Sequence, residues 1–178
     1  MFFPYKDDNP RILFPFITYG IIVLNIVTFL GQFLISSRDI QLGISVIYTF
    51  GFVPAEFNPF TIFTSMFMHG GLMHLGGNML YLWIFSDNVE DSIGRGRFII
   101  FYLLCGVCAA FAQAMTDPSS QVPMVGASGA LAGVLGAYLL LHPRANIRCI
   151  VGIFVSVSYT HLRAHETSLH LVCRLLLE

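Results

Sequence analysis

The sequence predicts an all-α, polytopic membrane protein. Of its 178 residues, 56% are hydrophobic and only 11% are charged, whereas a soluble domain has about 25% charged residues. The mean hydropathy is +0.74, and the apolar residues gather in runs close to the roughly 20 that cross a bilayer. A net charge of −1 gives no electrostatic basis for binding nucleic acid. We therefore expect the protein to be embedded in the lipid bilayer and not to bind nucleic acid.

Four apolar runs are long enough to be read as spans, and a fifth begins near the end of the chain. Each run is bounded by charged residues, proline or glycine. Residues 36–58, between the first two spans, are too numerous for a tight hairpin. The expected spans are residues 12–35, 72–89, 98–115, 125–141 and, cut short, 147 to about 157.

Lysine and arginine predict the orientation of these spans, because cytoplasmic loops carry an excess of positive charge. When the connections are assigned alternately to the two sides, only Arg38 falls on the outer side. The opposite side holds Lys6, Arg11, Arg95, Arg97, Arg144 and Arg148. This pattern places the N-terminus in the cytoplasm and residues 36–68 and 116–124 outside.

Three groups of polar residues lie where lipid makes them costly, which is typical of functional sites. One of them, Glu90-Asp91 with Gly94 and Arg95-Gly96-Arg97, lies at the expected cytoplasmic turn. His74 and Asn78, four residues apart, share one helix face at the start of the second span; His69 shortly precedes them. The fourth span opens with Gly126-Ala127-Ser128-Gly129. Both spans start on the outer side, so these other two groups lie within roughly 10 Å of the outer helix ends. We expect them to meet in one shallow pocket.

These residues could perform acyl transfer, which needs a nucleophile, a base and donors for an oxyanion. Ser128 supplies a hydroxyl, the helix start supplies unpaired N–H groups, and His74 and Asn78 supply side-chain donors. The alternative is that Ser128 packs among glycines and His74 makes an interhelical hydrogen bond, but their matching depth favours catalysis. His69 is interpreted as structural, and the C-x-x-C pair Cys105 and Cys108 as packing within an apolar helix.

The G-x-S-G run opening a fourth span, with H-x-x-x-N in a second, resembles the rhomboid family of intramembrane serine proteases over residues 12–155. The resemblance implies six spans, with Ser128 as nucleophile, Gly126 in the oxyanion region, and His74 and Asn78 stabilising the oxyanion. It also implies transmembrane protein substrates cleaved near the outer face of the plasma (inner) membrane. No metal, nucleotide or other cofactor is implied.

One feature departs from the family. Its base is a histidine on a sixth span, and that base histidine is absent here. His142 lies 14 residues beyond Ser128 on the same helix, about 21 Å along the axis, which is too far for proton transfer. We therefore expect an active intact parent and an inactive 178-residue chain. The alternative is a catalytically dead relative that binds membrane clients, and a solute channel ranks last because the polar residues share one depth.

The sequence divides into three parts. Residues 1–11 are an expected cytoplasmic segment and residues 12–155 an incomplete rhomboid-like membrane domain. Residues 156–178 form a tail that looks foreign, because three of the six histidines fall within it and no apolar run there could span a membrane. The remaining histidines, His161, His165 and His170, are therefore not expected to supply the base.

Overall fold

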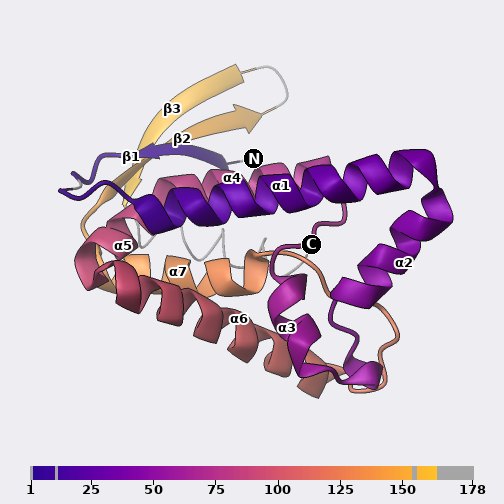
Figure 1. Cartoon of the computed structure of the whole chain (residues 1–178). Coiled ribbons are helices and arrows are strands. Elements are labelled where there is room, and N and C mark those ends of the chain that lie inside the picture. The colour runs from indigo at the N-terminus through magenta and orange to yellow at the C-terminus, as the bar shows by residue number, and fades with distance from the viewer. Residues whose placement is uncertain (1, 11, 154–155, 164–178) are drawn as a thin grey trace.

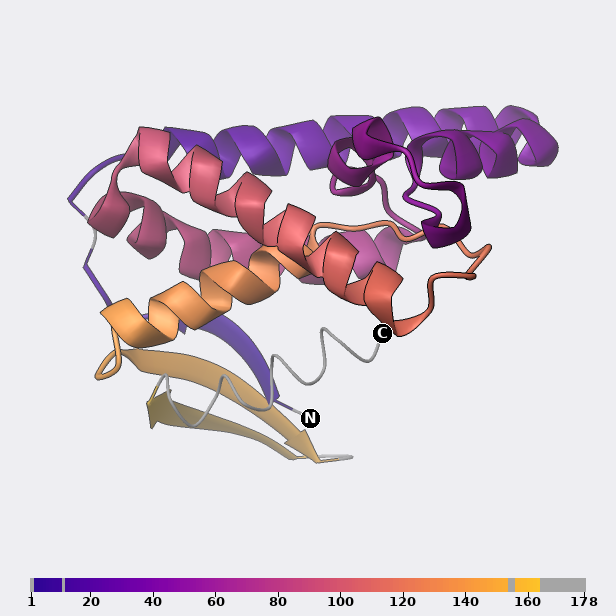
Figure 2. The same ribbon diagram turned by 90° about the horizontal axis from the view of Figure 1, so that it is seen from below.

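The computed structural model describes residues 2–10, 12–153 and 156–163, and it shows a bundle of helices with a small sheet at one end (Figure 1). The long helices α1 and α6 lie on opposite sides of the bundle in Figure 1, with α7 between them and α4 behind α1; Figure 2 shows α6 beside α7 from below. The helices are α1 (Phe16–Arg38), α2 (Ile40–Phe50), α3 (Pro59–Ser65), α4 (Leu72–Tyr81), α5 (Asp87–Ile93), α6 (Arg95–Thr116) and α7 (Ser128–Leu141). A 3₁₀ turn, η1 (Pro54–Glu56), precedes α3, and a π-helical turn, η2 (Leu82–Ser86), joins α4 to α5.

The predicted helical character is confirmed for the first four apolar runs. Helices α1 and α6, of 23 and 22 residues, are long and apolar enough to cross a membrane. Together α4, η2 and α5 form one helical stretch over residues 72–93. Helix α7 has only 14 residues, fewer than the roughly 20 of a full crossing. The four-span count therefore stays a prediction.

The expected fifth span is wrong, and with it the expectation that the chain is entirely α-helical. Residues 146–153 form strand β2 (Asn146–Ile153), which pairs antiparallel with β1 (Phe2–Asp7) and β3 (Ser156–Arg163). The run is short, is rich in isoleucine and valine, which favour strands, and finds pairing partners on both sides. The boundary expected at residue 155 falls between β2 and β3, at residues outside the described part.

The connection between the first two spans is also more ordered than the sequence indicated. Helix α2 occupies part of it, and the Asp39 side chain accepts hydrogen bonds from the N–H groups of Gln41 and Leu42 at its start. Such a cap satisfies donors that a helix start leaves free. Helix α3 begins similarly, with Asn58 accepting from the N–H of Phe60. These caps make the connection between α1 and α4 a folded unit.

The core lies where η2 and α5 meet α6 and α7. Its largest buried side chains include Phe85, Phe98 and Tyr138. Small residues bring α6 and α7 close together: a Cβ added at Gly133 would overlap the sulfur of Cys105, and one at Gly129 would overlap Ala109. Close approach through small residues is typical of helix pairs in membranes. Cys105 is a free cysteine within this contact, in agreement with the packing interpretation.

The start of α1 is fastened to α5 by two acidic side chains. Glu90 is only 3% exposed and accepts hydrogen bonds from the N–H groups of Ile17 and Thr18 at 3.1 and 2.8 Å, and from the Thr18 hydroxyl at 2.8 Å. Asp91 accepts from the N–H groups of Ile12 and Leu13. Carboxylates at a helix start satisfy free donors and complement the helix dipole. This contact fixes α1 against the helices that carry the candidate site.

Candidate functional site

Gly126 lies directly against the two polar side chains of α4. A Cβ added to Gly126 would lie 2.7 Å from Cε1 and 2.8 Å from Nε2 of His74, and 3.7 Å from Nδ2 of Asn78. Gly126 also has φ of +120°, a conformation that residues with a Cβ rarely adopt. Glycine is therefore required here for two reasons, its positive φ and the lack of room for a Cβ. Because Gly126 has no side chain, the backbone just before α7 can lie against His74 and Asn78.

The segment that leads into α7 is held in place by the connection between α1 and α4. The N–H of Gly126 donates to the carbonyl oxygen of Ser65 at 2.8 Å. Phe52 and Met124 exchange two backbone hydrogen bonds, of 3.0 and 2.8 Å. Sequence reasoning missed Ser65, because backbone partners leave no signature in residue type. The connection between α1 and α4 thus sets the position of residues 124–126.

Ser128 is the first residue of α7, two residues after Gly126, and is partly exposed. The preceding residue, Ala127, provides no side-chain cap. The first N–H groups of a helix have no partner within it, and the positive end of the helix dipole lies there. The start of α7 therefore combines a hydroxyl with uncapped backbone donors at the point where Gly126 touches α4.

Asn78 is 1% exposed, and its Nδ2 donates to the carbonyl oxygen of His74 at 3.1 Å. An amide nitrogen carries two hydrogens, so one N–H remains after this bond. Nδ2 is also the Asn78 atom found near Gly126, while Oδ1 has no hydrogen-bond partner. Asn78 thus keeps a buried donor beside the α7 start.

His69 lies next to His74, in the connection between α3 and α4. Its ring is 1% exposed, its two nitrogens have no hydrogen-bond partner, and its centroid is 5.2 Å from that of His74. Burial, with the nearby His74 adding to it, lowers the pKa of His69 to about 4. His69 is therefore neutral at pH 7. It contacts His74 as a ring rather than as an ion.

The side-chain amide of Gln32, on α1, makes two hydrogen bonds with the backbone of His69. Its Nε2 donates to the carbonyl oxygen of His69 at 3.2 Å, and its Oε1 accepts from the N–H of His69 at 3.1 Å. This pair of hydrogen bonds fixes the connection between α3 and α4. Helix α4 starts from this connection, at Leu72. The sequence showed Gln32 only as a polar interruption in an apolar run. A buried amide in a span is a usable signal, since such groups need partners.

The remaining histidines lie away from this site or outside the described part. His142 follows α7 at its other end, where Nδ1 lies 2.8 Å from Nδ2 of Asn9 and Nε2 lies 3.0 Å from the hydroxyl of Ser92. The side chain of His161 and all of His165 and His170 fall outside what the structure describes. Within the described residues, no three His, Cys, Asp or Glu side chains gather as a metal site.

Comparison with known proteins identifies the family to which this chain belongs. The model of the Rhomboid domain matches residues 56–174, two thirds of the chain, so the chain belongs to the rhomboid family. The match runs past the boundary expected at residue 155. The family places the chain among integral membrane proteins of the protease class, as the sequence indicated.

Among the curated relatives, Rhomboid protease GluP of Bacillus subtilis is 33% identical over 129 residues, which are 70% of this chain and 24% of that protein. Rhomboid protein 1, mitochondrial, of Saccharomyces cerevisiae is 34% identical over 95 residues, 51% of this chain and 28% of that protein. Putative rhomboid protease YdcA of Bacillus subtilis is 32% identical over 80 residues, 45% of this chain and 40% of that protein. The chain thus spans between about a quarter and two fifths of these relatives.

Proposed function

We propose that this protein is an intramembrane serine endopeptidase with Ser128 as its nucleophile. The observation that carries the proposal is the contact of Gly126 with His74 and Asn78, two residues before Ser128. It puts a hydroxyl, uncapped helix N–H groups and two side-chain donors at one place. Membership of a protease family supports the same chemistry.

In the proposed reaction, Ser128 Oγ attacks the carbonyl carbon of a peptide bond as its proton passes to a base. The carbonyl oxygen becomes an oxyanion, which the N–H groups near Gly126 and Ser128 and the side chains of His74 and Asn78 stabilise. Donors fixed before reaction need no reorganisation as this charge develops. The intermediate expels the amine to give an acyl-enzyme, and water releases the acid and restores Ser128.

The roles assigned above do not yet include a base for Ser128. A base must come within about 3 Å of the serine hydroxyl or act through one water. His142 is at the opposite end of α7, and His69 is buried next to His74. We propose that His74 acts as an oxyanion donor and that the base is a histidine from outside the described residues.

The proposed substrates are transmembrane proteins, cleaved near the outer face. Ser128 lies at the end of α7 away from the arginine-rich connections, and the excess of positive charge assigns those connections to the cytoplasm. Relatives from Bacillus subtilis and from mitochondria both match. We propose the plasma (inner) membrane, with the N-terminus in the cytoplasm, as the location.

A second candidate function is client binding by a protein without catalysis. The observation that favours it is that His142, the histidine at the end of the same helix as Ser128, lies at the other end of α7. The two candidates differ in the reactivity of Ser128, because a binding protein needs no activated hydroxyl. In this case the polar pocket would recognise an unwound segment of a membrane client without cleaving it.

A fluorophosphonate probe, which labels activated serines, separates the two candidates. The probe is applied to the 178-residue chain and to a chain extended through the remaining family spans. We expect labelling of the extended chain that disappears in Ser128→Ala and persists in Ser119→Ala, a matched change in an exposed loop. Labelling that survives Ser128→Ala, or an extended chain that is never labelled, would refute the protease.

A further inference from the structure

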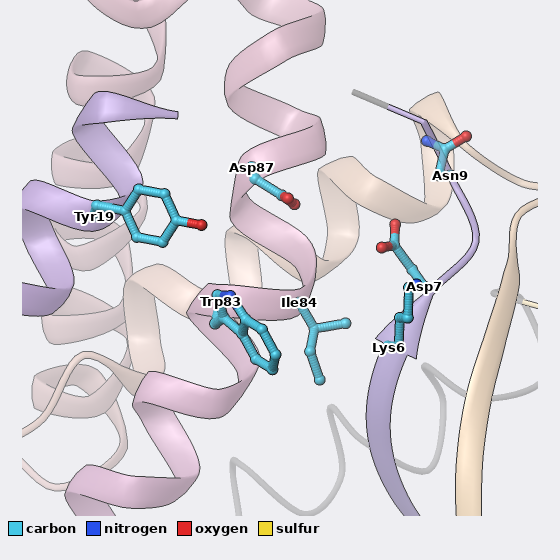
Figure 3. A pocket seen from close by; sticks show the side chains of 7 residues that line it. All are labelled: Lys6, Asp7, Asn9, Tyr19, Trp83, Ile84 and Asp87. Atoms are coloured by element: carbon cyan, nitrogen blue, oxygen red, sulfur yellow. The ribbon is translucent and has the colours of Figure 1, made fainter. Parts of the chain in front are cut away.

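The hollow beside the N-terminal segment is a junction of the fold. Figure 3 shows Asp7 and Asp87 in its lining. Both carboxylates already accept hydrogen bonds, Asp7 from Tyr138 and Asn88, and Asp87 from Asn88. These bonds connect the N-terminal segment to α5 and α7. A different hollow, on the side of the bundle formed by α1 and α6, has the character of a ligand site.

This second hollow is an apolar groove between the two long helices. It measures about 350 Å³, within the roughly 300–1,000 Å³ of small-molecule sites. No charged side chain of the described residues lines it, and Ser128 takes no part in it. Its walls include Phe16, Gly20 and Leu24 of α1 and Ile99 and Leu103 of α6, with Phe67 from the connection before α4.

Gly20 leaves part of this groove open. A Cβ added at Gly20 would meet no atom within 4 Å, whereas a Cβ at Gly133 would overlap Cys105 in the contact of α6 with α7. Gly20 therefore does not serve close packing of helices within the described residues. Glycine is otherwise unfavourable inside a helix. The groove exists in part because no side chain fills the space at this position of α1.

The width of the groove decides between a helix and a hydrocarbon chain as its occupant. Phe16 and Leu24 are eight residues apart, about 12 Å along α1. The volume of about 350 Å³ over this length gives a mean cross-section of about 30 Å². An α-helix with side chains has a diameter of at least about 10 Å, a cross-section of about 80 Å². The groove is too narrow for a partner helix, whereas an unbranched acyl chain is only one methylene wide.

A guanidinium group lies at one end of the groove. Cζ of Arg95 is 4.8 Å from the centroid of the Phe16 ring, and Arg95 precedes Ile99 by four residues, on the same face of α6. Its Nη2 donates to the carbonyl oxygen of Phe14 at 3.1 Å, and its Nε lies 4.0 Å from Oε1 of Glu90. A guanidinium has five N–H donors, and this side chain is 45% exposed. Arg95 therefore keeps donors for a further acceptor.

The direction of the groove fits a lipid. Helix α1 begins at Phe16 and α6 begins at Arg95, so both helices start at the end where the guanidinium lies. The apolar walls run from there into the two apolar helices. Arginines next to membrane helices attract anionic lipids, and basic pockets between such helices bind their head groups. The groove thus offers a positive group at the level of the head groups and apolar walls at the level of the acyl chains.

We propose that this groove binds an anionic phospholipid, with its phosphate at Arg95 and one acyl chain between α1 and α6. The chain fills the space that Gly20 leaves and contacts both helices. The bound lipid thereby joins the start of α1 to α6. This proposal does not depend on whether Ser128 is catalytic.

A photoreactive lipid tests the location and the charge together. Purified protein in detergent is incubated with phosphatidylglycerol that carries a diazirine in one acyl chain, illuminated and digested. We expect saturable labelling of peptides that contain residues 16–24 and 99–103. Unlabelled phosphatidylglycerol should compete at least about fivefold better than phosphatidylcholine of the same chain length. Labelling that does not saturate, or that spreads evenly over the helices, would overturn the proposal, and equal competition by the two lipids would overturn the anionic head group.

Gly20→Leu tests the groove by filling it. The new side chain enters open space, so we expect a folded protein and about tenfold less labelling. Gly31→Leu is the matched control, because Gly31 is eleven residues further along nearly the same face of α1, about 16 Å away, and also has open space at its Cβ position. Gly31→Leu should keep full labelling. Equal labelling of the two variants would overturn the placement of the acyl chain.

Arg95→Gln tests the phosphate contact. Glutamine keeps an N–H donor for the carbonyl oxygen of Phe14 but loses the charge, so the advantage of phosphatidylglycerol over phosphatidylcholine should fall below about twofold. Arg97→Gln should keep that advantage, because Arg97 is exposed and lies about 200° around the helix from Arg95. An unchanged advantage in Arg95→Gln would overturn the assignment of the phosphate. If Arg95→Gln cannot be purified folded, the lipid competition and the Gly20→Leu pair decide.

Oleate, an anion with one chain and no phosphate, distinguishes a phospholipid from a fatty acid. It should compete at least about fivefold more weakly than phosphatidylglycerol. If it competes equally well, the ligand is a fatty acid and the phospholipid is overturned.

Discussion

The two ends of the helical bundle differ in how most of their buried polar groups are satisfied; Ser86 Oγ and Tyr102 OH, towards the arginine-rich end, are exceptions without partners. At the arginine-rich end, Glu90 accepts three hydrogen bonds and both nitrogens of His142 have neighbours within 3.0 Å. At the Ser128 end, the ring nitrogens of His69 and Oδ1 of Asn78 have no partner, and α7 starts without a side-chain cap.

This difference distinguishes the end of the bundle where hydrogen bonds hold the helices together from the end where polar groups are free to contact a substrate. Buried polar groups are normally paired because an unpaired one costs roughly 1–3 kcal/mol. Groups left unpaired at one end are therefore reasonable candidates for contacts with a substrate. The paired end holds the helices in the positions that the unpaired end requires. Substitutions at the two ends should affect stability and reactivity differently.

The largest loss of stability should follow from Glu90→Ala at the paired end. It removes three hydrogen bonds and leaves the N–H groups of Ile17 and Thr18 without partners, at a cost of about 2–4 kcal/mol. Thermal unfolding in detergent measures the loss. Glu56→Ala, at an exposed site, is the control and should change stability little. Equal melting temperatures for the two variants would contradict the role of Glu90.

Gly126→Ala should affect both properties, because the new Cβ meets His74 and the backbone has φ of +120°. We expect a stability loss of about 1–3 kcal/mol and loss of fluorophosphonate labelling in the extended chain. Gly136→Ala, in the same region of chain but with open space at the Cβ position, should keep labelling. Full labelling of Gly126→Ala would break the proposed link between Gly126 and the site.

Gln32→Leu tests whether α1 supports the connection between α3 and α4. The change leaves the N–H and carbonyl of His69 without their partner, which should cost about 1–2 kcal/mol. Labelling of Ser128 in the extended chain should fall more than stability does, because α4 starts from this connection. Gln113→Leu, on the exposed face of α6, is the matched change. If both variants behave alike, His69 is held by other contacts.

The smallest expected effect is a pH dependence from Asp7. Its pKa is about 6 in the folded protein against an ordinary value of 3.8, so the folded state binds its proton more tightly than the unfolded state. The corresponding stability is fully present below about pH 4 and is lost as the pH rises through 6. Because Asp7 is half-buried, solvent screening limits the effect to about 1 kcal/mol. Melting temperatures are measured between pH 4 and 7 without added lipid. The fall in stability between these pH values should be smaller in Asp7→Asn than in the unchanged protein. If the two pH profiles are the same, a group other than Asp7 causes the pH dependence.

Much of the architecture could be predicted because hydrophobic runs of span length have few alternatives in a membrane. The runs at residues 12–35 and 98–115 became α1 and α6, within a few residues at each end. The run that begins at residue 147 was misread, because a short apolar segment can form a strand once pairing partners are present. Those partners are β1 and β3, which lie at distant or later positions in the chain.

Sequence alone therefore determined that the protein is a helical membrane protein, and it singled out Ser128, His74 and Asn78 by residue type, spacing and depth. The tertiary structure decided that Gly126 touches His74, that Ser65 and Gln32 hold the backbone around the site, and that Asp7 and Asp87 share a cavity. The physical reason is that apolar runs and helix periodicity are local properties of the chain. Backbone hydrogen bonds and cavities arise between segments far apart in sequence, and residue type does not record them.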